Sequence, residues 1–312
     1  MAGSSREVLA AGFFRHIAAC NTPVEEPFLP WLIDGRAVGW LRPRAAGHLH
    51  RFPEFFEVRE TGGDIGAVCL RPAIQGFDAR SEALRSVVQG LADDGCVPPY
   101  MDEPYPVTTA GRDTAVCVVD RCAAGFFGLR SFGQHLNGFV RRVDGIHMWL
   151  GRRARDRLLF PGALDNMVAG GLPQHITMKD NLVKECAEEA GVPEDLASQA
   201  VPVGVVSYNR VADRGYRRDL LYCYDLELPM DFVPCNTDGE VESFTLLPLD
   251  EVARLVSETD EFKLNCNLVV IDFLIRHGWL DPASSSYLPL TLGLRQPLAD
   301  GPVRSPAGIA AL

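Results

Sequence analysis

Along the first 130 residues, short segments with the hydrophobic period of a helix alternate with segments that have the period of a strand. Apolar runs at 28–33 and 37–41 flank the turn signal Asp34-Gly35, which predicts two paired strands. At 81–91 apolar residues recur every three or four positions, and this period predicts an amphipathic helix capped by Asp78. A further helix is predicted at 6–17 and a further strand at 114–119. The first part of the chain is therefore predicted to be an α/β domain.

A different pattern begins near residue 135. Two apolar stretches flank Val143-Asp144-Gly145 and predict a hairpin, and a loop rich in glycine and proline follows before a helix at 178–190. The other elements predicted here are strands at 201–208, 220–228 and 243–247, a helix opening at Asp250, and a helix at 262–277. We expect an N-terminal α/β domain at 1–130, a second domain at 131–282 and a partly disordered tail at 283–312.

Composition narrows the classes of function. The 312 residues include 30 basic and 41 acidic side chains, so the net charge is -11, which argues against a protein that binds nucleic acid through its phosphates. No stretch approaches the ~18 apolar residues that a membrane span needs. Nine cysteines occur at irregular spacing without a C-x-x-C pair, a pattern typical of reduced thiols. We therefore expect a cytoplasmic protein.

The helix at 178–190 carries the strongest chemical signal. Its glutamates Glu185, Glu188 and Glu189 are spaced i, i+3 and i+4, so their side chains lie on one face. Three crowded carboxylates repel one another, but they suit a hard divalent cation such as Mg²⁺. Gly170 and Gly171, shortly before the helix, allow backbone to approach a ligand closely. The alternative is an ordinary solvated acidic face.

The spacing resembles the signature of the Nudix hydrolases, G-x5-E-x7-R-E-U-x-E-E-x-G-U, where U is a bulky aliphatic residue. Gly170 takes the first glycine, and residues 184–192 take the second half. The resemblance places the family's three metal-binding glutamates at Glu185, Glu188 and Glu189. Ile176 replaces the early glutamate. Lys184 replaces an arginine that steers its neighbouring glutamate in the family, and lysine keeps the charge but loses the forked donor.

The resemblance extends over residues 8 to 285, to a Nudix subgroup related to the Nudix region found with thiamine pyrophosphokinase. The matching stretches are VGW at 38–40, DRCAAGFFG at 120–128, GQHLNGFV at 133–140, WLGRR at 149–153, LDNMVAGGLP at 164–173, YDLELP at 224–229 and FKLNCNLVVIDFLIRHG at 262–278. It implies a Nudix α/β/α sandwich with a mixed sheet, preceded by a smaller α/β domain. It also implies hydrolysis of thiamine diphosphate, or of a damaged form such as oxythiamine diphosphate, to the monophosphate.

Several further side chains are candidates for the reaction. Diphosphate hydrolysis needs charge neutralisation and a placed water, and one of the helical glutamates, or a carboxylate outside the helix, would accept the proton of that water. Glu240 and Glu242 are two apart before a strand, and we take Glu242 with Glu185, Glu189 and Lys184 as the catalytic set. A solvated turn is the competing interpretation. The candidates for binding substrate are Gly170, Gly171, Arg152 and Arg153, then Arg217, Arg218, His175, Trp149, Tyr208 and Tyr216.

The sequence therefore predicts a Mg²⁺-dependent diphosphatase, with Mn²⁺ as an alternative cation. The expected partner is a small-molecule diphosphate substrate. Binding to nucleic acid or to a membrane is not expected, and a homodimer is a possible oligomeric state. Two rivals stay open. The first is the same chemistry on another nucleoside or sugar diphosphate, and the second is a ligand-binding protein on a weakened Nudix fold, which Ile176 and Lys184 favour.

Overall fold

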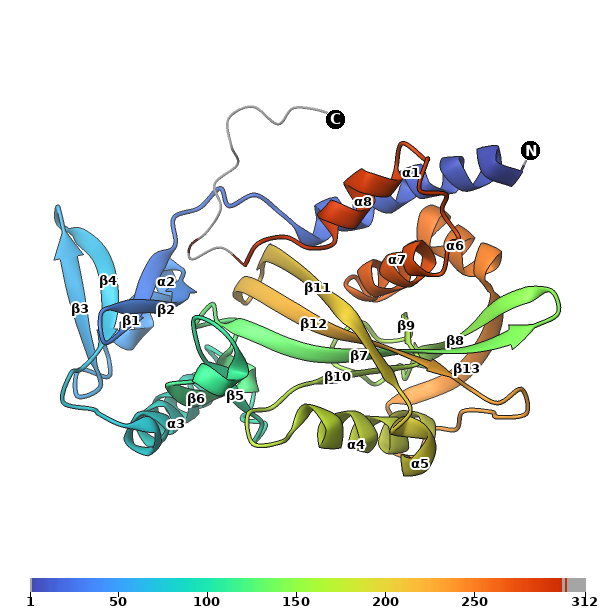
Figure 1. The fold of residues 1–312 in the computed structure, drawn as a ribbon. Coiled ribbons are helices and arrows are strands. Elements are labelled where there is room, and N and C mark those ends of the chain that lie inside the picture. Colours follow the sequence, from blue (N-terminus) through green and yellow to red (C-terminus); the bar gives the residue numbers. More distant parts are fainter. Residues whose placement is uncertain (1, 299–300, 302–312) are drawn as a thin grey trace.

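The computed structural model describes residues 2–298 and 301, and its largest element is a mixed sheet in the second half of the chain (Figure 1). The strands are β7 (Arg130–Arg142), β8 (Gly145–Arg153), β9 (Leu164–Asn166), β10 (Val168–Gly171), β11 (Val201–Ala212), β12 (Gly215–Glu227) and β13 (Val241–Pro248). Their order is β11-β12-β7-β8-β13, with β10 paired to β7 and β9 to β8. β12 and β7 run parallel and the other pairs antiparallel, which confirms the predicted mixed sheet.

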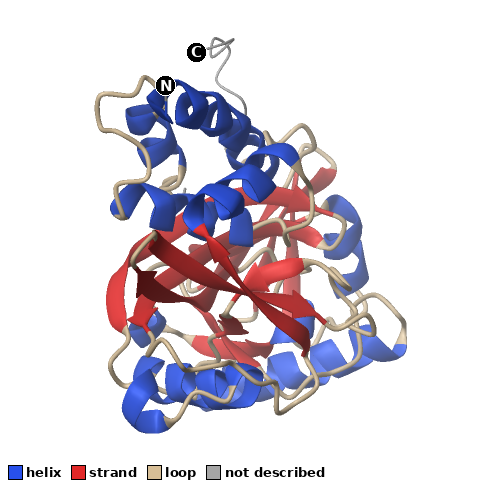
Figure 2. Cartoon of the chain, turned by 90° about the vertical axis from the view of Figure 1, so that its right-hand side faces the viewer, coloured by secondary structure: helices blue, strands red, loops and turns tan. Residues whose placement is uncertain are grey.

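Helices cover both faces of this sheet (Figures 1 and 2). One face carries α4 (Met178–Ala190) and α5 (Glu194–Ala197), and the other carries α1 (Ala2–Cys20), α6 (Leu249–Glu258), α7 (Cys266–Arg276) and α8 (Tyr287–Gly293). The alternation of side chains along β7 explains the division. Leu136 and Val140 are buried in the core beneath α4, whereas Phe139 packs against Phe273 of α7. The predicted α/β/α sandwich is confirmed.

Residues 31–129 have a hydrophobic core of their own, which includes Trp31, Leu84 and Phe127. The elements are β1 (Leu29–Ile33), β2 (Arg36–Leu41), α2 (Pro43–Leu49), β3 (Phe56–Thr61), β4 (Asp64–Leu70), α3 (Phe77–Asp93), β5 (Pro104–Val107) and β6 (Cys117–Asp120). Strands β2-β1-β4-β3 form one sheet, and β5 and β6 form a two-stranded one. Gly76, rather than Asp78, occupies the N-cap of α3, because the helix begins before the apolar period does.

The first helix lies apart from this N-terminal core. Phe13 of α1 packs against Trp279 with ring centroids 5.8 Å apart, and the His16 ring bonds the Val256 carbonyl at 2.6 Å. Helix α1 thus joins the core of the second half of the chain. The predicted domain boundaries at 130 and 282 stay predictions. Helix α8 lies within the predicted tail, and the last part of that tail, at 299–300 and 302–312, falls outside the described residues.

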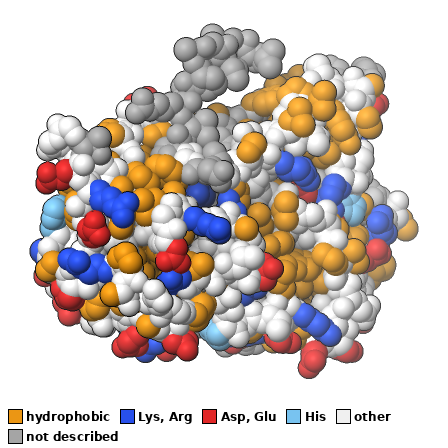
Figure 3. Space-filling model, turned by 60° about the vertical axis from the view of Figure 1, so that its left-hand side comes forward, with side chains coloured by type: hydrophobic (Ala, Val, Ile, Leu, Met, Phe, Trp, Pro, Cys, Tyr) orange, Lys and Arg blue, Asp and Glu red, His pale blue; other side chains and the backbone are white. Residues whose placement is uncertain are grey.

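The surface shows no single charged face in the view of Figure 3, where basic side chains are scattered among acidic and hydrophobic ones. Within residues 2–298 and 301, no helix combines the length and the apolar character that crossing a membrane requires.

Candidate active site

Helix α4 positions the candidate metal ligands. The Thr177 hydroxyl accepts a hydrogen bond from the Asp180 amide at 3.1 Å and caps the first turn, and the helix ends at Gly191. Leu182, Cys186 and Ala190 pack into the core beneath the sheet. The helix is therefore anchored by its apolar stripe, and its glutamates lie toward the edge strand β10.

Glu189 is buried against β10, with 8% of its surface exposed. Its carboxylate accepts a hydrogen bond from the Ala169 amide at 2.9 Å. Burial raises the pKa of Glu189 to about 8, and the nearby carboxylates of Asp165 and Glu185 act in the same direction. A carboxylate held in this way gains strongly from a cation, because one amide hydrogen bond does not offset the cost of burying its charge.

Glu185 lies one turn before Glu189 and contacts Gly170. A Cβ atom on Gly170 would lie 2.6 Å from Cδ and 2.7 Å from Oε2 of Glu185, so any other residue here would displace the carboxylate. Burial raises the pKa of Glu185 as well. The predicted importance of Gly170 thus has a structural reason: the missing side chain admits the carboxylate to the strand.

Lys184 lies between two of the glutamates. Its Nζ is 2.8 Å from Glu188 Oε2 and 3.4 Å from Glu185 Oε1. The ammonium group therefore reaches both neighbours as a point charge, where the family's arginine would use a fork. Burial opposes the charge on Lys184, but the bonds to Glu188 and Glu185 outweigh it and raise the pKa of the amine.

We predict that Lys184→Met moves the acidic limb of the kcat/KM pH profile to higher pH. Lys184 lowers the pKa of Glu185, so its removal lets burial raise that pKa further, and the variant needs a more alkaline solution to ionise the carboxylate. Lys184→Arg should keep the wild-type profile, and Lys179→Met, on the exposed start of the same helix, is the control. Superimposable profiles for Lys184→Met and wild type would contradict this role.

The glutamates suit a divalent cation by their chemistry, since Glu185, Glu188 and Glu189 offer hard oxygen ligands from one helix. Lys184 pairs with both Glu185 and Glu188, and the three carboxylates are not among the described groups whose ligand atoms all lie within 4.8 Å of one another. The ligand roles of the three glutamates, and the magnesium that they would hold, stay predictions.

Glu240 and Glu242 both form ion pairs with the loop between β8 and β9. Glu240 is 2.8 Å from Arg157, and Glu242 is 3.4 Å from Arg155. Burial raises the pKa of Glu185, and the negative charge of Glu240 adds to this rise. A register shift between Val241 and Ser243 falls at Glu242. The catalytic role of Glu242 stays a prediction.

The predicted substrate-binding arginines have protein partners. Arg152 donates to the Gly162 carbonyl at 2.9 Å and pairs with Glu261 at 2.8 Å. Arg153 donates to the Leu159 carbonyl and pairs with Asp165 at 3.1 Å. Their roles toward substrate stay predictions.

The remaining candidates fall into three groups. Arg217 pairs with Asp219 at 2.9 Å, whereas Arg218 is buried and donates to carbonyls of the N-terminal region. His175 is exposed in the loop before α4. The three aromatic candidates Trp149, Tyr208 and Tyr216 are buried.

Comparison with known proteins decides the family. A family model described as "Domain of unknown function (DUF4743)" matches residues 12–131. The Arabidopsis thaliana protein named "Nudix hydrolase 20, chloroplastic" is 42% identical over 290 residues, which cover 91% of this chain and 78% of that protein. The chain belongs to the Nudix hydrolase family. It is therefore a hydrolase acting on phosphoric anhydride bonds.

This Nudix hydrolase is also similar to a second Arabidopsis thaliana protein and to one solved structure. "Nudix hydrolase 24, chloroplastic" of Arabidopsis thaliana is 41% identical over 286 residues, covering 91% of this chain and 78% of that protein. The solved NUDIX domain of Shewanella oneidensis NrtR, complexed with ADP ribose, is 14% identical with a TM-score of 0.38, covering 48% of this chain and 90% of that one. The predicted tie to the subgroup related to thiamine pyrophosphokinase stays a prediction.

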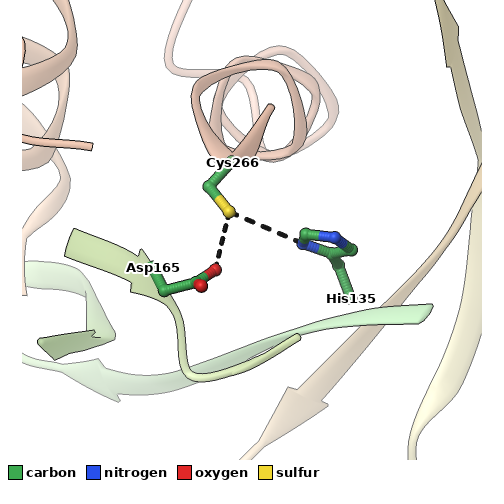
Figure 4. A group of neighbouring side chains, drawn as sticks. All are labelled: His135, Asp165 and Cys266. Carbon is green, nitrogen blue, oxygen red and sulfur yellow. Dashed lines mark hydrogen bonds between the residues drawn. The ribbon is translucent and has the colours of Figure 1, made fainter. Parts of the chain in front are cut away.

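A second polar cluster lies close to Glu189 in this Nudix hydrolase. His135 of β7, Asp165 of β9 and Cys266 of α7 point toward one another (Figure 4). Within the described part of the chain, they are the one group of His, Cys, Asp or Glu whose potential ligand atoms all lie within 4.8 Å of one another. The sequence pattern includes all three residues in the matching stretches, but their spacing assigns them no role.

Existing bonds already balance the charge of this cluster. Cys266 Sγ donates to Asp165 at 2.6 Å, and Asp165 also pairs with Lys263 at 3.0 Å and with Arg153. Burial opposes the charge on Asp165, but Lys263 and the other donors outweigh it and lower the pKa of the carboxyl. Burial and Lys263 lower the pKa of His135 to about 4, so its ring is neutral. A metal ion would have to compete with two cations for Asp165, and the cluster is better explained as a support beneath the site.

Proposed function

We propose that this Nudix hydrolase is a magnesium-dependent diphosphatase that converts thiamine diphosphate, or a damaged analogue such as oxythiamine diphosphate, to the monophosphate. The observation that carries the diphosphatase part is the placement of Glu185 and Glu189 in low-dielectric positions against Gly170 and Ala169. The thiamine part rests on the resemblance of the stretches quoted above. The relatives named as Nudix hydrolases support the reaction class.

The candidate residues have separate roles in the proposed reaction. Glu185, Glu188 and Glu189 would hold the cation, which when bound neutralises phosphate charge and makes a water more acidic. Burial raises the pKa of Glu185, and the positive charge of Lys184 opposes this rise and so favours the ionised carboxylate. A site carboxylate accepts the proton of the attacking water, and the candidates are Glu185, Glu189 and Glu242. Gly170 admits the Glu185 carboxylate to β10 and Gly171 admits the Tyr105 hydroxyl, so the two glycines support the diphosphate site by positioning these side chains.

We further propose that the protein acts in the cytoplasm. All nine cysteines are free thiols, and seven of them are buried, which accords with a reducing compartment.

A substrate panel tests the proposal. We predict metal-dependent release of phosphate from thiamine diphosphate and oxythiamine diphosphate with Mg²⁺, and weaker or no turnover of ADP-ribose and CoA. Wild type and Glu189→Gln would be assayed side by side, with Glu194→Gln on the exposed start of α5 as the matched control. Preference for ADP-ribose would overturn the thiamine part alone. Absence of metal-dependent turnover on every compound would overturn the diphosphatase itself.

A further inference from the structure

The N-terminal region contacts the loop that leads into α4. We call residues 171–177 the pre-helix loop. The Gln174 amide donates to the Pro104 carbonyl at 2.7 Å, and the Gln174 side chain donates to the Arg112 carbonyl at 3.0 Å. In return, the Arg112 guanidinium donates to the carbonyls of Pro173 and Ile176, the latter at 2.9 Å. Four hydrogen bonds thus connect residues 104–112 with the middle of the pre-helix loop.

The start of the same loop meets two more side chains of the N-terminal region. A Cβ atom on Gly171 would lie 2.1 Å from the Tyr105 hydroxyl and 3.3 Å from Nη1 of Arg121. Tyr105 is buried, and Arg121 is held by Glu103 at 2.9 Å. The N-terminal region and the second half of the chain therefore approach each other closely at Gly171. Its neighbour Gly170 is the residue that contacts Glu185.

The two ends of the pre-helix loop are held from the other side by the large sheet and α4. Asn181 donates to the Gly171 carbonyl at 3.0 Å, and Gln134 of β7 donates to the Met178 carbonyl at 2.8 Å. The Leu172 amide also donates to the Phe132 carbonyl of β7 at 3.1 Å. From Pro173 to Ile176, the loop is held by its bonds to Arg112 and Pro104, so the N-terminal region supports its middle.

Arg112 is suited to this role and to little else. It is half-buried, and no ion pair with a carboxylate is found for it among the described residues, so the bonds that hold its guanidinium go to backbone carbonyls. Burial lowers the pKa of the Arg112 guanidinium, which shows that its charge is costly here. Ile176, which stands where the family signature has a glutamate, offers no charged side chain, and its backbone carbonyl is held instead.

We propose that the N-terminal domain positions the pre-helix loop for catalysis, and that Arg112 is the positioning residue through which it does so. The inference rests on the proposed function, because it assumes that α4 and Gly170 form the cation and diphosphate site. Thr177 ends the loop and caps α4, so a displaced loop moves the helix start and with it the distance between Glu185 and Gly170. A misplacement of about 1 Å in a catalytic group can reduce turnover about 100-fold.

The test compares Arg112→Ala and Arg112→Lys with wild type in the full chain. We expect Arg112→Ala to speed amide hydrogen exchange in residues 171–177, to weaken Mn²⁺ binding, and to lower kcat/KM by about 10- to 100-fold, chiefly through kcat. Arg112→Lys keeps a cationic donor and should recover part of each loss. Arg80→Ala is the control, since Arg80 bonds the Ile74 carbonyl and Asp34 within the same domain and does not contact the loop.

Two outcomes would overturn the positioning role: unchanged loop exchange and Mn²⁺ affinity in Arg112→Ala, or equal changes in Arg80→Ala. Should Arg112→Ala unfold the N-terminal domain, Gln174→Ala removes one of the four hydrogen bonds from the loop side, the one from the Gln174 side chain to the Arg112 carbonyl, and we expect the same changes at smaller size. No change in Gln174→Ala would then decide against the inference. If wild type hydrolyses no diphosphate, the proposed function fails, while the exchange and Mn²⁺ measurements still decide about Arg112.

Discussion

Glu189→Gln should reduce metal-dependent hydrolysis by about 100- to 1,000-fold while making the metal-free protein more stable at alkaline pH. Glutamine keeps an oxygen that can accept the hydrogen bond from the Ala169 amide. It removes the negative charge that a cation needs, and it also removes the cost of burying that charge. The substitution should therefore lower the activity and raise the stability at alkaline pH of the same protein.

The sign of the stability effect follows from the pKa of Glu189, which rises from 4.5 to about 8 on folding. Between these values the folded state keeps a proton that the unfolded state has released, so wild-type stability falls as pH rises through this range. Above about pH 8 the penalty is complete, and removing it should stabilise Glu189→Gln by about 2 to 4 kcal/mol. Below pH 4.5 the two proteins should be equally stable.

Denaturant unfolding of wild type and Glu189→Gln without metal, at acidic and alkaline pH, measures this difference. Glu194→Gln, on an exposed helix start, controls for the loss of one negative charge. A variant that is destabilised at both pH values would mean that Glu189 is an ordinary structural carboxylate.

Asp165→Ala should destabilise the protein by about 3 to 5 kcal/mol, because it leaves two largely buried cations without the buried carboxylate that they share. Lys263 and Arg153 both pair with Asp165, and only 7% of the Asp165 side chain is exposed. Adding Lys263→Met to the variant should recover part of the loss, since one unpaired charge is removed.

The exposed pair between Arg141 and Glu227, 3.1 Å apart, is the control for Asp165. Glu227→Ala should change the free energy of unfolding by less than about 1 kcal/mol. Equal effects of Asp165→Ala and Glu227→Ala, measured by denaturant unfolding, would show that the buried cluster is not a structural support.

Local patterns in the sequence predict α4 and its neighbours well. The apolar stripe through Leu182, Cys186 and Ala190 orients the helix, and the spacing of the glutamates then follows. The strands around residues 143–145 are likewise found, although β7 begins earlier, at Arg130. These features depend on short-range periodicity, which one sequence contains in full.

Long-range placements are not predictable in the same way. Helix α1 packs against α6 and α7, about 250 residues away, and nothing in its own period selects those partners. Arg153 of β8 pairs with Asp165 of the neighbouring strand β9. An arginine whose guanidinium could bind phosphate therefore holds a buried carboxylate instead. The register shift between Val241 and Ser243 falls at Glu242, and a shift of this kind cannot be anticipated from simple alternation.

The central claim is that the carboxylates of α4 hold the catalytic cation, and Mn²⁺ binding followed by electron paramagnetic resonance tests it most directly. Wild type and Glu194→Gln should bind Mn²⁺ equally, and Mg²⁺ should compete for the site. Glu185→Gln and Glu189→Gln should each weaken binding by about tenfold or more, and the variant with Glu185, Glu188 and Glu189 all replaced by glutamine should show no specific binding. Wild-type affinity in that triple variant would contradict the account.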